Sequence, residues 1–96
     1  MAYSKSDLLT FDEVQLKAMI EIVEEVRDKM VVSKNSFDDY IAEQLKPNWT
    51  TEGGLNTVSS LENFSNSNIQ SFIEYINARI QDLYSTLDSV QKINIA

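Results

Sequence analysis

The only tryptophan, the only proline and both glycines of this 96-residue chain lie together near its centre. They occupy the segment Pro47-Asn48-Trp49-Thr50-Thr51-Glu52-Gly53-Gly54, between two long helix-like stretches. Because proline cannot continue a helix and glycine relaxes the backbone, the segment predicts one sharp turn over residues 47–54. A large aromatic side chain in a turn needs a surface to lie against. For Trp49 that surface is either the two helices beside the turn or a second molecule, and both can hold at once.

The first stretch predicts a helix over residues 10–46. Thr10 and Glu13 have the spacing of a capping box at its start, and Pro47 disfavours the α conformation at Lys46. Apolar residues recur every three or four positions, which is typical of a helix that packs along its whole length. This stripe consists of Leu16, Met19, Val23, Val26, Met30, Phe37 and Tyr40, with Ser33 filling the slot between Met30 and Phe37, and Ile20 and Ile41 widen it by one position each.

The second stretch predicts a helix over residues 55–93. Seven of its apolar residues form a coiled-coil-like seam without a polar interruption, namely Ile69, Ile73, Ile76, Ile80, Leu83, Leu87 and Val90. The seam is preceded by Ser65-Asn66-Ser67-Asn68, four residues of poor helix propensity. The helix is therefore either continuous and weakened there, or kinked at 65–68 and restarted by a capping box of Ser67 and Gln70.

The amino-acid composition argues against several classes of function. The chain has no cysteine and no histidine, so it lacks the usual ligands of a zinc site and the commonest acid–base catalyst. Its serines have no evident base, and we expect no enzyme, no catalytic residue, no metal and no cofactor. A net charge of −7 argues against nucleic acid, and the apolar runs are too short for membrane insertion. The acidic row Glu21, Glu24, Glu25 and Asp28 indicates a solvated face, with Lys17, Arg27 and Lys29 nearby for pairing.

Two long helices joined by a short connection pack antiparallel. We therefore predict an all-α fold in which residues 1–96 form a single domain, an antiparallel helix-turn-helix hairpin. Two helices are too thin a layer to bury a wide apolar stripe. The pattern predicts pairing into a four-helix bundle, as a homodimer with a second hairpin or as a heterodimer with another helical partner.

The layout resembles the WXG (Esx-type) small substrates of bacterial type VII secretion, which are acidic helical hairpins of this length with a tryptophan at the turn. Tyr84-Ser85-Thr86-Leu87-Asp88 matches the Tyr-x-x-x-Asp/Glu export signature of those systems, so the resemblance implies that Tyr84 and Asp88 form an export signal. The family turn is Trp-x-Gly, whereas here Gly53 and Gly54 follow Trp49 at a greater distance. The sequence thus resembles a divergent branch, such as the small targeting partners of LXG-type toxins.

The resemblance implies a non-enzymatic export substrate, or a targeting partner or chaperone, that binds a helical partner such as the N-terminal domain of a toxin. Trp49, Gly53 and Gly54 would form a turn-recognition element, and the type VII export ATPase would read the composite signal. Residues 1–10 lack the pattern of a Sec signal peptide, so the expected location is cytoplasmic and then secreted or cell-surface by a Sec-independent route. The alternative is a cytoplasmic immunity or regulatory protein that binds and neutralises a partner, for which an acidic charge suits a basic toxin.

Overall fold

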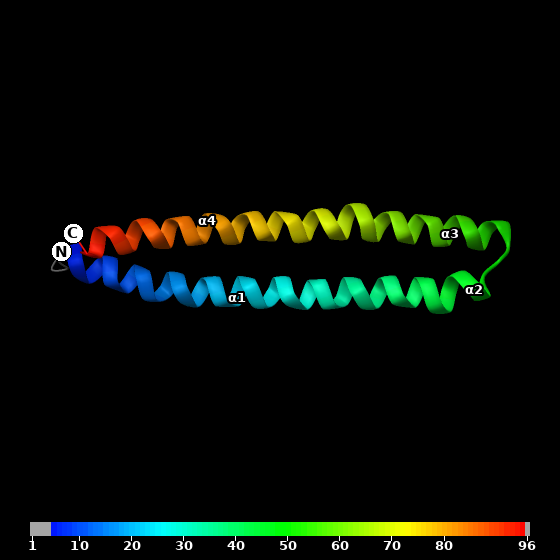
Figure 1. Ribbon diagram of the computed structural model, residues 1–96, viewed down its shortest axis with the longest axis horizontal. Helices are drawn as coiled ribbons and strands as arrows, with labels where there is room; N and C mark the ends of the chain where they lie inside the picture. Colours follow the sequence, from blue (N-terminus) through cyan, green and yellow to red (C-terminus); the bar gives the residue numbers. More distant parts are fainter. Residues whose placement is uncertain (1–4, 96) are drawn as a thin grey trace.

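The computed structural model describes residues 5–95 of the chain, and the side chains of residues 13–94. The described chain is a helical hairpin, as predicted, in which two long rods lie antiparallel (Figure 1). The first rod runs through α1 (Lys5–Tyr40), the π-helical turn η1 (Ile41–Leu45) and α2 (Lys46–Asn48). The second runs through α3 (Glu52–Asn63), the π-helical turn η2 (Phe64–Ile69) and α4 (Gln70–Ile95).

The first helix begins earlier than predicted. It starts at Lys5, so Thr10 lies inside the helix and is not its N-cap. The physical reason is that residues 5–9 include two leucines and neither glycine nor proline, and so favour helix. The side chain of Thr10 lies outside the described side chains.

The turn is also shorter than predicted. The chain remains helical through Pro47 to Asn48, and only Trp49, Thr50 and Thr51 separate the two rods. A proline inside a regular α-helix loses a hydrogen bond and clashes with the preceding turn. Here the π-helical turn η1 ends at Leu45, two residues before Pro47, and its wider bonding pattern joins the Lys46 N–H to the Ile41 carbonyl. The predicted helix end at Lys46 is therefore wrong.

The second rod is continuous, so the kink and restart considered for residues 65–68 do not occur. The backbone remains in the right-handed helical region at Asn63 and Gln70, on either side of η2, and Ser67 does not cap a new helix. A π-helical turn takes more residues per turn than an α-helix. It lets Leu61, Ser65, Ile69 and Ile73, spaced by four, stay on one face of the rod.

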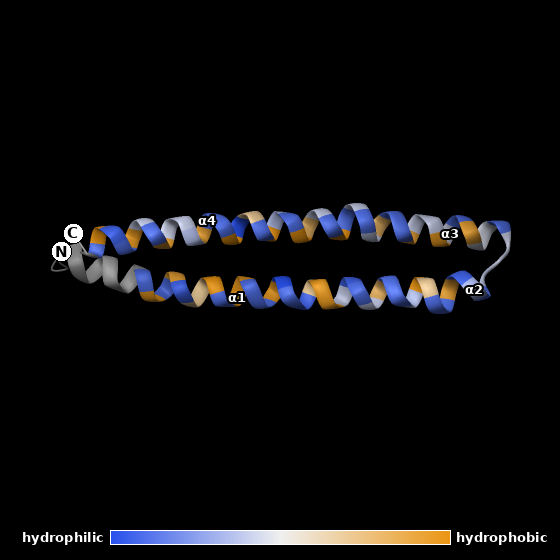
Figure 2. Cartoon of the chain, viewed as in Figure 1, coloured by the Kyte–Doolittle hydropathy of each residue, from blue (hydrophilic) through white to orange (hydrophobic). Residues whose placement is uncertain are grey.

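The core is a single seam between the two rods. Hydrophobic residues of α3 and α4 recur along the edge turned toward α1 (Figure 2). The most deeply buried apolar residues are Ile20, Ile41, Val58, Ile73, Ile76, Ile80 and Leu87. Of the remaining residues of the predicted second seam, Ile69, Leu83 and Val90 are half-buried. The seam of α4 thus faces α1 within one hairpin.

The inward stripe of the first rod agrees with the predicted one at Leu16, Val23, Met30 and Phe37, and at its other positions it lies one residue further along the chain. Its members are Leu16, Ile20, Val23, Arg27, Met30, Lys34, Phe37 and Ile41, all buried or half-buried. Met19, Val26 and Tyr40 are instead exposed. Ile20 and Ile41, expected only at the margin of the stripe, are central to it. Two cations, Arg27 and Lys34, occupy seam positions, and this is why the apolar spacing alone did not identify those positions.

Candidate functional site

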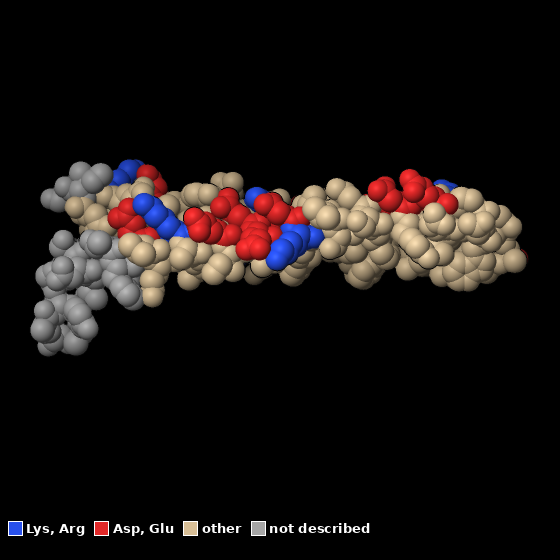
Figure 3. All heavy atoms as spheres, turned by 90° about the horizontal axis from the view of Figure 1, so that it is seen from below, with Lys and Arg blue, Asp and Glu red and all other residues tan. Residues whose placement is uncertain are grey.

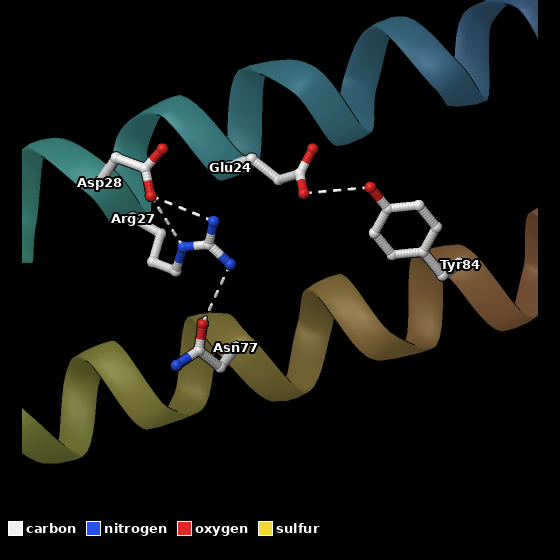
Figure 4. A network of polar contacts seen from close by, with 5 residues as sticks. All are labelled: Glu24, Arg27, Asp28, Asn77 and Tyr84. Carbon is white, nitrogen blue, oxygen red and sulfur yellow. Dashed lines mark hydrogen bonds and ion pairs between the residues drawn. The ribbon is translucent and has the colours of Figure 1, made fainter.

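Tyr84 of α4 reaches across the hairpin to α1. Its hydroxyl donates a hydrogen bond to Oε2 of Glu24 at 3.0 Å, and its side chain remains 44% exposed. Figure 4 shows the ring extending from α4 toward the carboxylate. The bond to the Glu24 carboxylate, together with partial burial and the negative charge, raises the pKa of Tyr84 above its usual value of 10.0. The shift favours the protonated form of Tyr84, which is the form that donates this hydrogen bond.

Asp88 lies one helical turn beyond Tyr84, on the same side of α4. Its carboxylate is exposed and pairs with Lys92 at 2.9 Å, along its own helix. The two residues of the expected export signal thus share a side but have different partners. Tyr84 is anchored to the opposite helix, whereas Asp88 projects into solvent.

Arg27 forms a second link between the helices beside Tyr84. Its Nη1 donates to Oδ1 of Asn77 at 3.4 Å, and its guanidinium also pairs with Asp28 at 3.0 Å (Figure 4). At the end opposite the turn, Gln91 and Asn94 donate to the carboxylate of Glu13, at 3.2 Å and 2.8 Å. Glu24, Asn77 and these end contacts were not identified from the sequence, because they depend on which residues of two helices face one another.

These contacts define one side of the hairpin, called here the polar side. Its residues directly follow seam positions, as Glu24 follows Val23 and Tyr84 follows Leu83. Its members include Lys17, Glu21, Glu24, Asp28, Asn77, Tyr84, Asp88 and Gln91. Acidic side chains form a band along one edge of the face seen in Figure 3, and uncharged side chains occupy the other edge.

Within the described residues, no cluster of three or more histidine, cysteine, aspartate or glutamate side chains is placed to hold a metal ion.

Residues that directly precede seam positions form the opposite side, called here the apolar side. Met19 precedes Ile20 and Phe72 precedes Ile73, for example, and antiparallel packing brings these flanks of the two rods to the same side. Exposed large hydrophobic residues gather here, namely Met19, Ile22, Val26, Tyr40, Phe64, Phe72, Tyr75 and Ile93. An exposed stripe of this kind marks an interaction surface. Of the predicted interface seam, Met19 and Val26 are therefore the members accessible to a partner.

Trp49 lies partly against its own hairpin and is partly free for contact with a second molecule. Its indole ring lies against Gly54 and remains 42% exposed. Gly54 lies in the first turn of α3, where Thr51 caps the helix by accepting the Gly54 N–H at 3.1 Å. Neither Gly53 nor Gly54 has a positive φ, so these glycines are not needed for a left-handed turn. Gly54 instead leaves room for the tryptophan ring.

The fold and its two sides define a small all-α hairpin with an uncovered apolar surface. Comparisons with models of protein families, with curated proteins and with solved structures found no match. Among the described helices, none is both long and apolar enough to cross a membrane.

Proposed function

We propose that this protein is a non-enzymatic hairpin of a bacterial type VII secretion pathway, either a substrate or the targeting partner of a larger toxin. The observation that carries the proposal is the separation of two surfaces. The apolar side offers a helical partner a place to pack, while Tyr84 and Asp88 lie on the polar side. A partner bound to the apolar side would leave the Tyr-x-x-x-Asp element accessible to the export ATPase.

The proposed mechanism is packing rather than chemistry. A helical partner covers Met19, Val26, Phe72 and their neighbours and completes a four-helix bundle. The bond between Tyr84 and Glu24 fixes the tyrosine relative to α1. An export signal built this way is complete only when both rods are folded, which suits a pathway that takes folded helical substrates.

The test is secretion from a bacterial host that carries the export ATPase and the candidate toxin. Tyr84→Ala and Asp88→Ala should abolish appearance of the protein, or of its toxin, in the culture supernatant. Both positions lie outside the seam, so each change should alter folding stability by no more than about 1 kcal/mol, and partner binding should be nearly unchanged. Glu74→Ala is the matched control, because Glu74 is an exposed carboxylate of the same helix that follows the seam residue Ile73 and so lies on the polar side, away from the apolar side. Equal secretion of all four proteins would contradict the signal assignment.

A second candidate function is favoured by the acidic band on the polar side (Figure 3). A cytoplasmic immunity or regulatory protein could use that band to capture a basic toxin, because opposite charge steers association. In that case the wild-type protein would remain in the cytoplasm in every host background. Binding to the toxin would then weaken with increasing salt and with removal of Glu21 or Asp28.

A further inference from the structure

A small hollow opens on the polar side, between the two rods and beside Tyr84. Its volume is about 220 Å³, which exceeds the roughly 150 Å³ of a cavity that holds one benzene molecule. It is lined by Lys17, Ile20, Glu21, Glu24, Tyr84 and Leu87. We propose that this hollow binds a single arginine side chain presented by a protein partner. The inference goes beyond export, because it concerns which side chain the polar side receives, whatever the partner does.

The floor of the hollow is apolar. Ile20 of α1 and Leu87 of α4 belong to the buried seam, and only 3% and 9% of their surfaces are exposed. A small hydrated cation would gain nothing from such a floor. An arginine side chain has an aliphatic stem that packs against apolar surface while its charged end stays near water.

Two carboxylates of α1 border the hollow. Glu21 is exposed, and no described side chain forms an ion pair with it. Glu24 is half-buried and accepts the Tyr84 hydroxyl at Oε2, which fixes this carboxylate and leaves Oε1 available. A guanidinium group binds carboxylate oxygens with two parallel hydrogen bonds, so the rim suits the charged end of an arginine.

The cations beside the hollow are engaged elsewhere. Lys17 pairs with Glu13 at 3.3 Å, and the guanidinium of Arg27 is directed to Asn77 and Asp28, away from the hollow (Figure 4). The hollow therefore keeps the negative charge of its own two carboxylates.

The titration of Tyr84 agrees with this charge. The bond to Glu24, partial burial and the charges of Glu24 and Glu21 together raise the pKa of Tyr84, despite the opposing charge of Arg27. Negative charge thus outweighs positive charge at the wall of the hollow.

The same combination of groups is present in complete form elsewhere on α4. Arg79 lies over the Tyr75 ring, 4.9 Å from its centre, and pairs with Asp82 at 3.2 Å. A tyrosine ring and a carboxylate therefore hold a guanidinium group there. At the hollow, Tyr84 supplies the ring and two glutamates supply the carboxylates, but no arginine of the described chain enters. Arginine fits this place better than lysine, because its planar guanidinium both stacks on aromatic rings and binds carboxylates in pairs.

The first test adds a short peptide, acetyl-Gly-Arg-Gly-amide, to the isotopically labelled full chain in about 0.15 M salt, where distant charges are screened. Binding should be in the millimolar range, because one side chain supplies little free energy, and should shift the NMR signals of the Ile20 and Leu87 methyl groups and of the Tyr84 ring. The peptide with citrulline, an uncharged analogue of arginine, should not bind, and the lysine peptide should bind about threefold or more weakly. Equal binding of either analogue, or shifts spread evenly along the acidic band, would overturn the proposal.

A pair of charge variants locates the site. Glu21→Gln should weaken binding of the arginine peptide roughly fivefold or more, because it removes a carboxylate that has no other cationic partner among the described side chains. Glu25→Gln is the matched control, since Glu25 is an exposed glutamate of the same helix that pairs with Lys29 at 3.1 Å and lies outside the hollow. Both variants remove one negative charge, so equal weakening by the two would overturn the assignment.

A pair of variants at Tyr84 tests the aromatic wall. Tyr84→Phe keeps the ring and should bind the arginine peptide, whereas Tyr84→Ala should lose binding while remaining helical by circular dichroism. Equal affinities of the two variants would overturn the role of the ring and with it the choice of arginine. All of these measurements use the purified chain without an export ATPase, and Glu21→Gln leaves Tyr84 and Asp88 unchanged. Their outcome is therefore independent of the secretion test.

Discussion

The indole ring of Trp49 occupies the space where a side chain on Gly54 would stand. A Cβ on Gly54 would lie 2.6 Å from both Cγ and Nε1 of the ring, and closer still to Cδ1. The neighbouring Gly53 has nothing within 4 Å of the same position. Two adjacent glycines of one helical turn therefore have different roles, and only Gly54 is required by a contact.

Gly54→Ala should displace Trp49 and destabilise the hairpin by about 1–3 kcal/mol, the usual cost of overpacking. Gly53→Ala should be neutral or stabilising by up to about 1 kcal/mol, because alanine favours helix and meets open space. Urea unfolding followed by tryptophan fluorescence measures both effects. Identical midpoints and identical emission maxima for the two variants would show that the ring does not depend on Gly54.

Ser65 is a polar residue in the apolar seam, with 0% of its surface exposed. Its hydroxyl donates to Oδ1 of Asp38, whose Oδ2 accepts from Lys34 Nζ at 2.8 Å. Ser65→Ala should therefore cost about 1–2 kcal/mol of unfolding free energy, because the bond to a charged acceptor is lost inside the seam. Ser60→Ala is the control, since its exposed hydroxyl only returns to the Asn56 carbonyl of the same helix. Equal thermal midpoints for the two variants would rule out a stabilising role of this bond.

The same cluster makes stability depend on pH. Hydrogen bonds from Lys34 and Ser65 hold the pKa of Asp38 below its ordinary value of 3.8. The unfolded chain binds the proton first, so the stabilisation from Asp38 is complete above about pH 4 and is lost as pH falls through the lower folded pKa. The stability difference between wild type and Asp38→Asn should thus be constant at neutral pH and shrink in acid. Urea midpoints between pH 2.5 and 7 measure it, with Asp39→Asn as the control for net charge. A difference that grows in acid would contradict the assignment.

The buried face of the second helix could be predicted well because its aliphatic residues form a single repeat, with no second stripe of aliphatic residues beside it. From Ile69 to Val90 every third or fourth residue is aliphatic, and a helix with one such stripe must turn it toward its neighbour. The first helix carries two overlapping stripes, one through Ile20 and Ile41 and one through Met19 and Val26. Hydropathy favours the second, because Arg27 and Lys34 interrupt the first. Their long aliphatic stems allow them to lie in the seam while their charged ends reach Asn77, Asp28 and Asp38.

The candidate site was less predictable than the fold. The pair Tyr84 and Asp88 can be recognised from its spacing, but its anchor Glu24 lies 60 residues away and depends on the register of the two rods. That register is affected by the π-helical turns η1 and η2, which no local signal in Pro47 or in Ser65-Asn66-Ser67-Asn68 specifies. Likewise, a glycine in a central segment indicates a turn from sequence alone, but Gly54 lies inside the helix α3. The position of the Trp49 ring, which occupies the space of a Gly54 side chain, explains why glycine is needed there.

The hairpin is 69 Å long, and α1 begins at the same end at which α4 finishes (Figure 1). A domain fused to either terminus would therefore lie at the end of the hairpin opposite the turn, and would leave Trp49 accessible at the turn.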